Sequence, residues 1–367
     1  MKKRERNRKT GTTFLSLGLL AAALGLQILA RKVPGFAQLY AGTVYRFLVE
    51  VFGRIWSLFP FSVAEIGLYG LVLFCVGGTV FLLRQAASGR IGWRPALMRA
   101  CRAFLLIGSA LFFSYTVGCG MNYCRTAFSV EAGLSAAPSS REDLAALCTW
   151  LAEMINDAAG QISQDENGCL ALEGDIAEEA RRAMENLGEE YPVLEGYYPR
   201  PKAVAVSRML SVQKIEGIYS PFTLEANYNR EMPDVDIPVT MCHELSHLRG
   251  FMREDEANFI AWLACVQSGD PRFIYSGAIL AYIHSSNALY RDGGEEEYRE
   301  IYDSLCDMAK RDLAADSAFW RQFDGKVAEV SSQVNDAYLK ANKQEDGVKS
   351  YGRMVDLLLS MYREGRP

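Results

Sequence analysis

The sequence predicts a mainly α-helical membrane protein in two parts. Three membrane-spanning helices are expected in residues 1–121, and an α+β domain with a small sheet in residues 122–367. Three apolar runs near the N-terminus, with Glu65 as their one charged residue, support the first part. The sign of the net charge changes at the same point. Residues 1–120 contain 15 Lys and Arg and 3 Asp and Glu, whereas the remainder contains 24 Lys and Arg and 41 Asp and Glu. A basic apolar part joined to an acidic part is typical of a membrane anchor with a domain in water. The acidic domain also argues against nucleic-acid binding, because phosphate would repel it.

The three spans are expected at about residues 12–30, 63–83 and 103–121, and each run is long enough to cross a bilayer. The first is interpreted as an uncleaved signal anchor, with a cleaved signal peptide as the alternative. The loop between the second and third spans, residues 84–102, carries five arginines and no acid. By the positive-inside rule this loop and the N-terminus face the cytoplasm, so everything after about residue 121 lies outside it.

Residues 33–61 are apolar and aromatic but also charged, with Pro34 and Pro60 near the two ends. They are interpreted as an interfacial helix lying on the lipid bilayer, with a plain extracytoplasmic loop as the alternative. The nine cysteines include no CxxC pair, and Cys119 with Cys124 is the pair considered for a disulfide.

In the second part, most segments have helical periodicity, and two do not. Residues 202–207 and 217–229 have the pattern of short strands. The stretch VDIPVTMCHELSHLRG follows as a helix, with Pro238 in its first turn and Gly250 as its stop. From Glu254 onward the chain is expected to be helical almost to its end.

The motif HELSH, residues 243–247, contains two of the three histidines of the chain. On a helix, positions i and i+4 share one face, so His243 and His247 are able to bind one metal ion. Glu244 lies one position on, where it reaches a water on the metal but not the metal itself. This arrangement is typical of a zinc hydrolase, in which the glutamate acts as general base.

A third protein ligand is needed, and Glu254, Asp255 and Glu256 are the candidates. Gly250 permits a sharp reversal, after which Glu254 and Asn258 fall on one face of the next helix. Glu254 is therefore the preferred ligand, with Glu256 as the alternative, and Asn258 is expected to orient a ligand histidine. For each acid, the simpler interpretation is a charge favoured by the dipole at a helix N-terminus. One Zn²⁺ per chain is the predicted cofactor.

HELSH followed by EDEAN resembles the HExxH…ExxA(D/N) signature of gluzincin metallopeptidases, the thermolysin-like superfamily. The resemblance implies His243, His247 and Glu254 as zinc ligands, Glu244 as base, Asn258 as the residue that orients a histidine, and a zincin-like fold. Only six residues separate His247 from Glu254, a gap far shorter than is usual in gluzincins. The third histidine of metzincins is absent, because Arg253 occupies its place.

The three spans, with GIYSPFTLEANYN, HELSHLRGFMREDEANFIAWLAC and the distal YLKANKQEDGVKSYGRMVDLLL, resemble the bacterial membrane family called domain of unknown function 3810. That resemblance implies a multi-pass protein of the bacterial cell membrane. The predicted function is zinc-dependent hydrolysis of peptide bonds outside the cytoplasm, in a peptide or cell-envelope substrate. The alternatives are a metal-bound membrane sensor or scaffold without turnover, and a zinc amidohydrolase acting on a non-peptide.

The stretch PFTLEANYN lies directly upstream of the motif helix and offers an edge strand for substrate binding. A peptide substrate is expected to pair with Glu225, Ala226 and Asn227 by strand addition, although an ordinary strand or loop is equally compatible with the pattern. An oxyanion needs a donor besides the zinc, and Tyr219, Tyr228 and His284 are the candidates. His284 is better explained as a histidine satisfied within its own helix.

Overall fold

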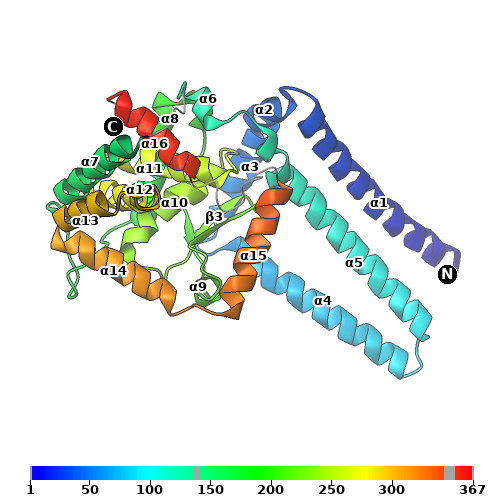
Figure 1. Cartoon of the computed structure of the whole chain (residues 1–367). Coiled ribbons are helices and arrows are strands. Elements are labelled where there is room, and N and C mark those ends of the chain that lie inside the picture. The colour runs from blue at the N-terminus through cyan, green and yellow to red at the C-terminus, as the bar shows by residue number, and fades with distance from the viewer. Residues whose placement is uncertain (1, 135–139, 343–351, 366–367) are drawn as a thin grey trace.

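The computed structural model describes residues 2–134, 140–342 and 352–365, and it is mostly helical with one three-stranded sheet. Three long helices, α1, α4 and α5, project from one side of a rounded body that contains the sheet and the remaining helices (Figure 1). The predicted combination of three apolar helices, a mainly helical chain and a small sheet is therefore confirmed. Residues 343–351, within the distal stretch that the sequence analysis singled out, lie outside the described residues.

The three projecting helices are α1 (Lys2–Lys32), α4 (Val63–Ala87) and α5 (Trp93–Tyr115). Each contains a segment long and apolar enough to cross a membrane: Gly11–Lys32, Val63–Ala87 and, with the short helices after α5, Trp93–Cys124. Large apolar side chains on α4 are exposed. Since water is a poor environment for such a surface, lipid is the natural cover for it.

The segment between α1 and α4 is helical and packs on the body. α2 (Phe36–Tyr40), the π-helical η1 (Ala41–Tyr45) and α3 (Arg46–Trp56) follow one another directly. Tyr45 and Val49 on this segment are buried, whereas Leu39 and Phe47 are exposed. One face therefore contacts protein, and the other retains the apolar surface expected of a helix on a bilayer. The expectation of a helix rather than a loop is confirmed, and its place in a membrane stays a prediction.

The core of the body is formed by helices around the motif helix α10 (Ile237–His247). α11 (Glu254–Gln267) and α12 (Pro271–Arg291) pack against α10, and α7 (Arg141–Ala159) packs along α12. Their contact faces bury Trp262 and Tyr275 completely. The other helices are η2 (Thr116–Gly120), η3 (Asn122–Cys124), α6 (Phe128–Glu131), α8 (Ile176–Glu190), η4 (Pro192–Leu194), α9 (Arg208–Ser211), η5 (Asp234–Asp236), α13 (Glu295–Ser304), α14 (Asp307–Arg321), α15 (Lys326–Ala341) and α16 (Gly352–Arg363).

The sheet has the order β1-β3-β2. β1 (Lys202–Ala203) is parallel to β3 (Glu225–Tyr228), and β2 (Gly217–Ser220) is antiparallel to it, with Gly217 opposite Tyr228 and Ser220 opposite Glu225. The sheet is attached to the projecting helices. The backbone N–H groups of Val63 and Ala64, in the first turn of α4, donate to the Glu225 carboxylate at 3.2 and 2.8 Å.

All nine cysteines are free. Cys119 is buried, with its Sγ 3.7 Å from Sδ of Met252. Cys119 and Cys124, the pair considered for a disulfide, are therefore not bonded to each other in this structure.

Candidate metal centre

The two motif histidines lie one turn apart at the end of α10. Pro238 occupies the first turn, where its missing N–H costs no hydrogen bond, and the helix ends at His247. Gly250 follows in the left-handed region, with φ of +83°, a conformation that glycine adopts without strain. The Nε2 atoms of His243 and His247 are 3.2 Å apart, and the two rings are perpendicular. Both histidines therefore direct the same nitrogen at a common point.

Glu254 joins the pair from the next helix. Its preceding residue, Arg253, is extended, so α11 begins at Glu254 itself. Oε2 of Glu254 is 3.3 Å from Nε2 of His243, and one ligand atom from each of His243, His247 and Glu254 lies within 4.8 Å of the others. Two ligand atoms at 2.0–2.2 Å from a tetrahedral zinc ion are about 3.3–3.6 Å apart. The spacing therefore fits a metal ion bound by these three residues.

The second nitrogen of each imidazole has an oxygen acceptor. Nδ1 of His243 is 2.6 Å from Oδ1 of Asn258, and Nδ1 of His247 is 2.7 Å from the carbonyl oxygen of Phe251. An acceptor at Nδ1 places the proton there and leaves the Nε2 lone pair free for a metal. Asn258 thus lies where the sequence analysis expected it, whereas the Phe251 carbonyl was not anticipated, because it depends on the path of the loop.

The charges of the three residues favour a cation at their centre. Burial lowers the pKa of His243, but the Glu254 carboxylate outweighs this effect and raises it to about 9. Burial and the charge of His243 lower the pKa of His247 to about 4. The raised pKa of His243 favours its protonated form, with Glu254 as the counter-charge. A divalent ion would replace that proton, since ligand histidines must be neutral.

Glu244 lies beside the three residues but is not one of them. A side-chain carbon added at Gly217 would lie 2.5 Å from Oε1 of Glu244, so only glycine at this position of β2 lets the carboxylate approach the strand. Burial raises the pKa of Glu244 to about 8; the charge of His243 and the N–H of Tyr219 oppose the rise, while Glu254 and Glu216 add to it. Gly217 was missed by the sequence analysis, because nothing local marks its contact with α10.

With this geometry established, comparison with known proteins identifies the family. Residues 40–359 match the model of the family described as "Protein of unknown function (DUF3810)". The chain belongs to this family. The match covers the second and third apolar helices, the sheet and the three clustered residues of the DUF3810 protein. No curated protein and no solved structure matches the chain.

The other acids of α11 in the DUF3810 protein have different partners. Glu256 accepts a hydrogen bond from the backbone N–H of Phe128 at 2.7 Å and forms an ion pair with Arg253 at 2.9 Å. Asp255 is buried and faces Arg353 at 4.0 Å. The structure does not bring Glu256, the alternative third ligand, to the histidines, because residues 254 and 256 point to different sides of a helix.

The three candidate oxyanion donors lie in different elements. The Tyr219 ring packs 5.9 Å from that of His247, but its hydroxyl lies 2.9 Å from the Tyr45 hydroxyl and donates to the Gly118 carbonyl at 2.8 Å. Tyr228 is the last residue of β3 and pairs with Gly217 of β2, the glycine that lies against Glu244. His284 lies in α12, where burial lowers its pKa to about 4. His284 does not belong to the cluster of His243, His247 and Glu254.

The prediction that Glu225, Ala226 and Asn227 lie in an edge strand was wrong. β3, which contains Glu225, Ala226 and Asn227, is the central strand, with β1 on one side and β2 on the other. Its side chains at these three positions are buried. The strand at the edge and beside Glu244 is β2. The error arises because strand order depends on β1, more than 20 residues upstream, which the local pattern of β3 does not reveal.

Three further side chains hold the loop between the two ligand helices. The Tyr45 hydroxyl donates to the His247 carbonyl at 2.9 Å. Arg125 donates to the Arg249 carbonyl, and Arg249 donates to the carbonyls of Tyr197, at 2.8 Å, and Glu195. Buried arginines that bond backbone carbonyls stabilise irregular segments, because those carbonyls would otherwise lack partners. No sequence signal links Tyr45 to a site 200 residues later.

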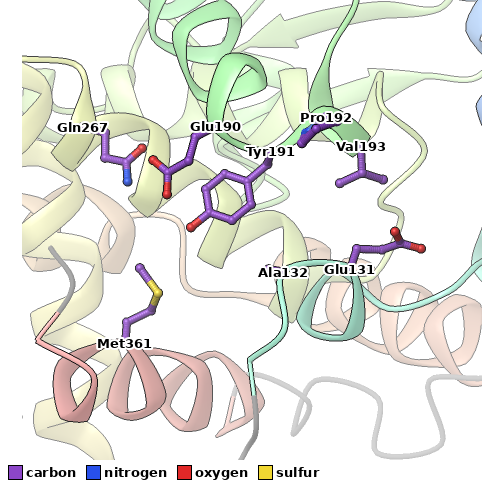
Figure 2. A pocket seen from close by; sticks show the side chains of 8 residues that line it. All are labelled: Glu131, Ala132, Glu190, Tyr191, Pro192, Val193, Gln267 and Met361. Atoms are coloured by element: carbon purple, nitrogen blue, oxygen red, sulfur yellow. The ribbon is translucent and has the colours of Figure 1, made fainter.

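A hollow of about 650 Å³ lies elsewhere on the body (Figure 2). The side chains of Glu190, Tyr191, Glu131 and Met361 line it, from α6, α8 and its following turn, and α16. It contains none of the clustered residues, so its chemistry is separate from that of the candidate metal centre.

Proposed function

We propose that this protein is a membrane-anchored, zinc-dependent peptidase that hydrolyses peptide bonds outside the cytoplasm. The observation that carries the proposal is the convergence of one ligand atom each from His243, His247 and Glu254 within 4.8 Å of one another, with Glu244 adjacent but outside the ligand set. Structural zinc sites are closed by four protein ligands, whereas catalytic sites have three and an open position. Three ligands and a neighbouring base favour catalysis over a scaffold.

Zinc bound by these three residues would supply Lewis acidity, which polarises a substrate carbonyl and acidifies water. Glu244 would accept the proton of the attacking water and then deliver it to the leaving amine. Its burial and raised pKa suit a group that must both take and release a proton near neutral pH. Asn258 and the Phe251 carbonyl would keep both imidazoles in the orientation that ligation requires.

The edge of β2 that lies away from β3 supports a peptide substrate. The Glu216 carbonyl accepts from the N–H of Asn229 on the β3 side. Because hydrogen-bonding directions alternate along an antiparallel strand, the backbone groups of Gly217 and Tyr219 point to the other side. That side faces Glu244, whose pKa the Tyr219 N–H lowers. An extended peptide that added to β2 would therefore pass the general base.

The attachment of the sheet to α4 would hold the site near the membrane surface. Glu225 binds the first turn of α4, and the Tyr219 hydroxyl bonds the carbonyl of Gly118, beyond the end of α5. If these helices cross the bilayer, β2 lies at the outer ends of two spans. The substrate would then be a peptide or cell-envelope component close to the membrane.

The test compares three forms of the full-length protein in detergent: wild type, Glu244→Gln and the exposed control Glu300→Gln. Zinc content and cleavage of a mixed peptide library, read by mass spectrometry, are measured for each. We expect all three to retain zinc and only Glu244→Gln to lose cleavage, by about 10³-fold or more.

Other outcomes lead to different conclusions. Zinc binding without cleavage by the wild type would favour the sensor or scaffold, and cleavage of non-peptide amides alone would favour an amidohydrolase. If Glu244→Gln loses zinc as completely as His243→Ala, the role of Glu244 as base is wrong.

A further inference from the structure

Helix α15 has an apolar face that the described part of the chain leaves exposed. Val327, Val330 and Val334 fall within an arc of about 60° around the helix, and their side chains are 58%, 57% and 63% exposed. We call these three residues the valine stripe. The structure describes every residue of α15, and among them Leu339 alone is buried. A helix in water normally buries its apolar face, so the valine stripe indicates a different environment.

The N-terminal end of α15 is linked to the start of α4, where that helix leaves the body. Phe323, three residues before α15, packs under Arg208 of α9, whose guanidinium carbon lies 4.5 Å from the centre of the ring. Glu65, in the first turn of α4, accepts a hydrogen bond from the N–H of Val206, two residues before α9, at 3.0 Å. The Val206 side chain is exposed, so the apolar surface continues from α15 towards α4.

The C-terminal end of α15 is held where α5 and α1 reach the body. The ring of Tyr338 packs on that of Tyr115, the last residue of α5, with 6.2 Å between the ring centres. Arg31, near the end of α1, donates to the backbone carbonyl of the last residue of α15 at 3.5 Å. The Tyr338 hydroxyl also lies 3.4 Å from Sγ of Cys119, which contacts Met252 in the loop between the two ligand helices. Both ends of α15 are therefore fixed beside the body ends of the three long helices.

This placement favours a lipid surface as the cover of the valine stripe. α15 crosses the side of the body from which α4 and α5 project (Figure 1). It has 16 residues, with Glu329 and Asp336 outside the stripe, and is too short and too polar to cross a bilayer. A short helix with one apolar and one polar face lies in the plane of the membrane surface. If α4 and α5 cross the bilayer, lipid head groups surround their body ends, and a protein partner would have to displace them.

We propose that α15 lies on the surface of the bilayer that the three long helices cross, with the valine stripe in contact with lipid. The inference rests on the membrane anchoring in the proposed function and is independent of peptidase activity. Lys340 lies outside the stripe and pairs with Asp336 at 2.6 Å. Apolar contact rather than lipid charge therefore holds the helix to the membrane, and a neutral lipid is sufficient.

The experiment uses full-length protein in phosphatidylcholine nanodiscs, with photoreactive p-benzoylphenylalanine introduced at one position at a time. After illumination, mass spectrometry separates adducts with lipid from adducts with protein. Val330 and Val334 test the valine stripe. Glu329 and Ser332, which are also exposed on α15 but lie outside the stripe, are the matched controls. Leu73, 73% exposed on α4, reports a position expected to lie among the lipid chains.

We expect lipid adducts at Val330 and Val334 to be at least about fivefold more frequent than at Glu329 and Ser332, because only the stripe faces the membrane. Equal yields at all four positions, with lipid adducts at Leu73, would overturn the inference and leave the membrane anchoring intact. Adducts between two copies of the chain in place of lipid adducts at the two valines would overturn it in favour of self-association. Absence of lipid adducts at Leu73 would overturn the membrane anchoring and the inference together.

Discussion

Each ligand histidine is fixed by both of its ring nitrogens. Nε2 of His243 points to the centre of the cluster and Nδ1 to Asn258, while His247 uses the Phe251 carbonyl in the same way. Neither partner touches the metal position, yet each determines where the imidazole lone pair points. The quality of the site therefore depends on residues that a list of ligands omits.

The assignment of the third ligand leads to the first prediction. Glu254→Ala should weaken zinc binding at least 100-fold, because it removes the only carboxylate 3.3 Å from His243 Nε2 among the described residues. Zinc retained after dialysis against a chelator series measures the effect. Glu256→Ala is the matched control.

Glu256→Ala should leave zinc affinity nearly unchanged and lower the free energy of unfolding by about 1–3 kcal/mol, because the Phe128 N–H and Arg253 lose their partner. If Glu256→Ala releases zinc and Glu254→Ala does not, the third ligand is misassigned.

The half-buried Asp236 leads to a prediction about pH and stability. The folded-state pKa of Asp236 is raised, so between its unfolded and folded pKa values the folded protein binds more protons than the unfolded one. Stability should therefore fall as pH rises from about 4 through the folded pKa. Asp236→Asn should raise Tm at pH 8 by about 2–4 °C, the shift that corresponds to about 1 kcal/mol in a domain of this size, and by less at pH 5.

Thermal unfolding of the zinc-free protein in detergent measures this effect, with the exposed Asp303→Asn as control. A lower Tm for Asp236→Asn at pH 8 than for wild type would show that the ionised carboxylate stabilises the fold, contrary to its raised pKa.

At the scale of elements, a short loop brings two helices together at the metal centre. α10 ends at His247 and α11 begins at Glu254. The Tyr45 hydroxyl, from the segment before α4, donates to the His247 carbonyl, and Arg249 of the loop donates to the Tyr197 carbonyl. The segment 36–56, expected to lie on the bilayer, therefore also supports the candidate active site. This contact provides a physical route by which membrane insertion would affect the site.

Glu225 is predicted to join the sheet to α4 rather than to bind substrate. Its carboxylate pairs with the buried Lys202 at 2.6 Å and accepts from Val63 and Ala64. Glu225→Ala would leave a buried ammonium without its partner and should lower the free energy of unfolding by about 3–5 kcal/mol. Glu225→Gln keeps two polar atoms at the site and should cost less.

Denaturant unfolding of the purified protein measures both Glu225 variants. A folded Glu225→Ala protein of unchanged stability but raised KM would instead support the original assignment of this residue to substrate binding.

At the scale of the whole molecule, charge and apolar surface indicate how the chain sits in a membrane. The three long helices extend to one side of the body, and the loop between α4 and α5 lies at their far end (Figure 1). That loop carries the arginine cluster, whereas the body carries the excess of acids. By the positive-inside rule, the body with its metal cluster is predicted to lie outside the cytoplasm.

Single cysteines introduced at two exposed positions test this topology. Ser163→Cys, on the body, should react with a membrane-impermeant maleimide in intact cells, and Ser88→Cys, after α4, should react only in lysed cells. The parent protein measures background from the native cysteines. The reverse labelling pattern would place the candidate active site in the cytoplasm and exclude an extracytoplasmic substrate.

The features that local sequence determined are those that depend on short separations along the chain. Apolar runs of about 20 residues determined the three apolar helices, because their length and composition suffice. The shared face of His243 and His247 follows from helical periodicity, and Gly250 allowed the short reversal that brings Glu254 to them. Asn258 follows from the same periodicity one turn later.

Tertiary structure alone decided which strand lies beside Glu244, because strand order depends on β1 and on pairings across the whole sheet. It also decided that Glu225 binds α4 and that the Tyr219 hydroxyl bonds Gly118, 101 residues away in the chain. Periodicity determines which residues share a face of one element, whereas packing between elements determines which faces meet.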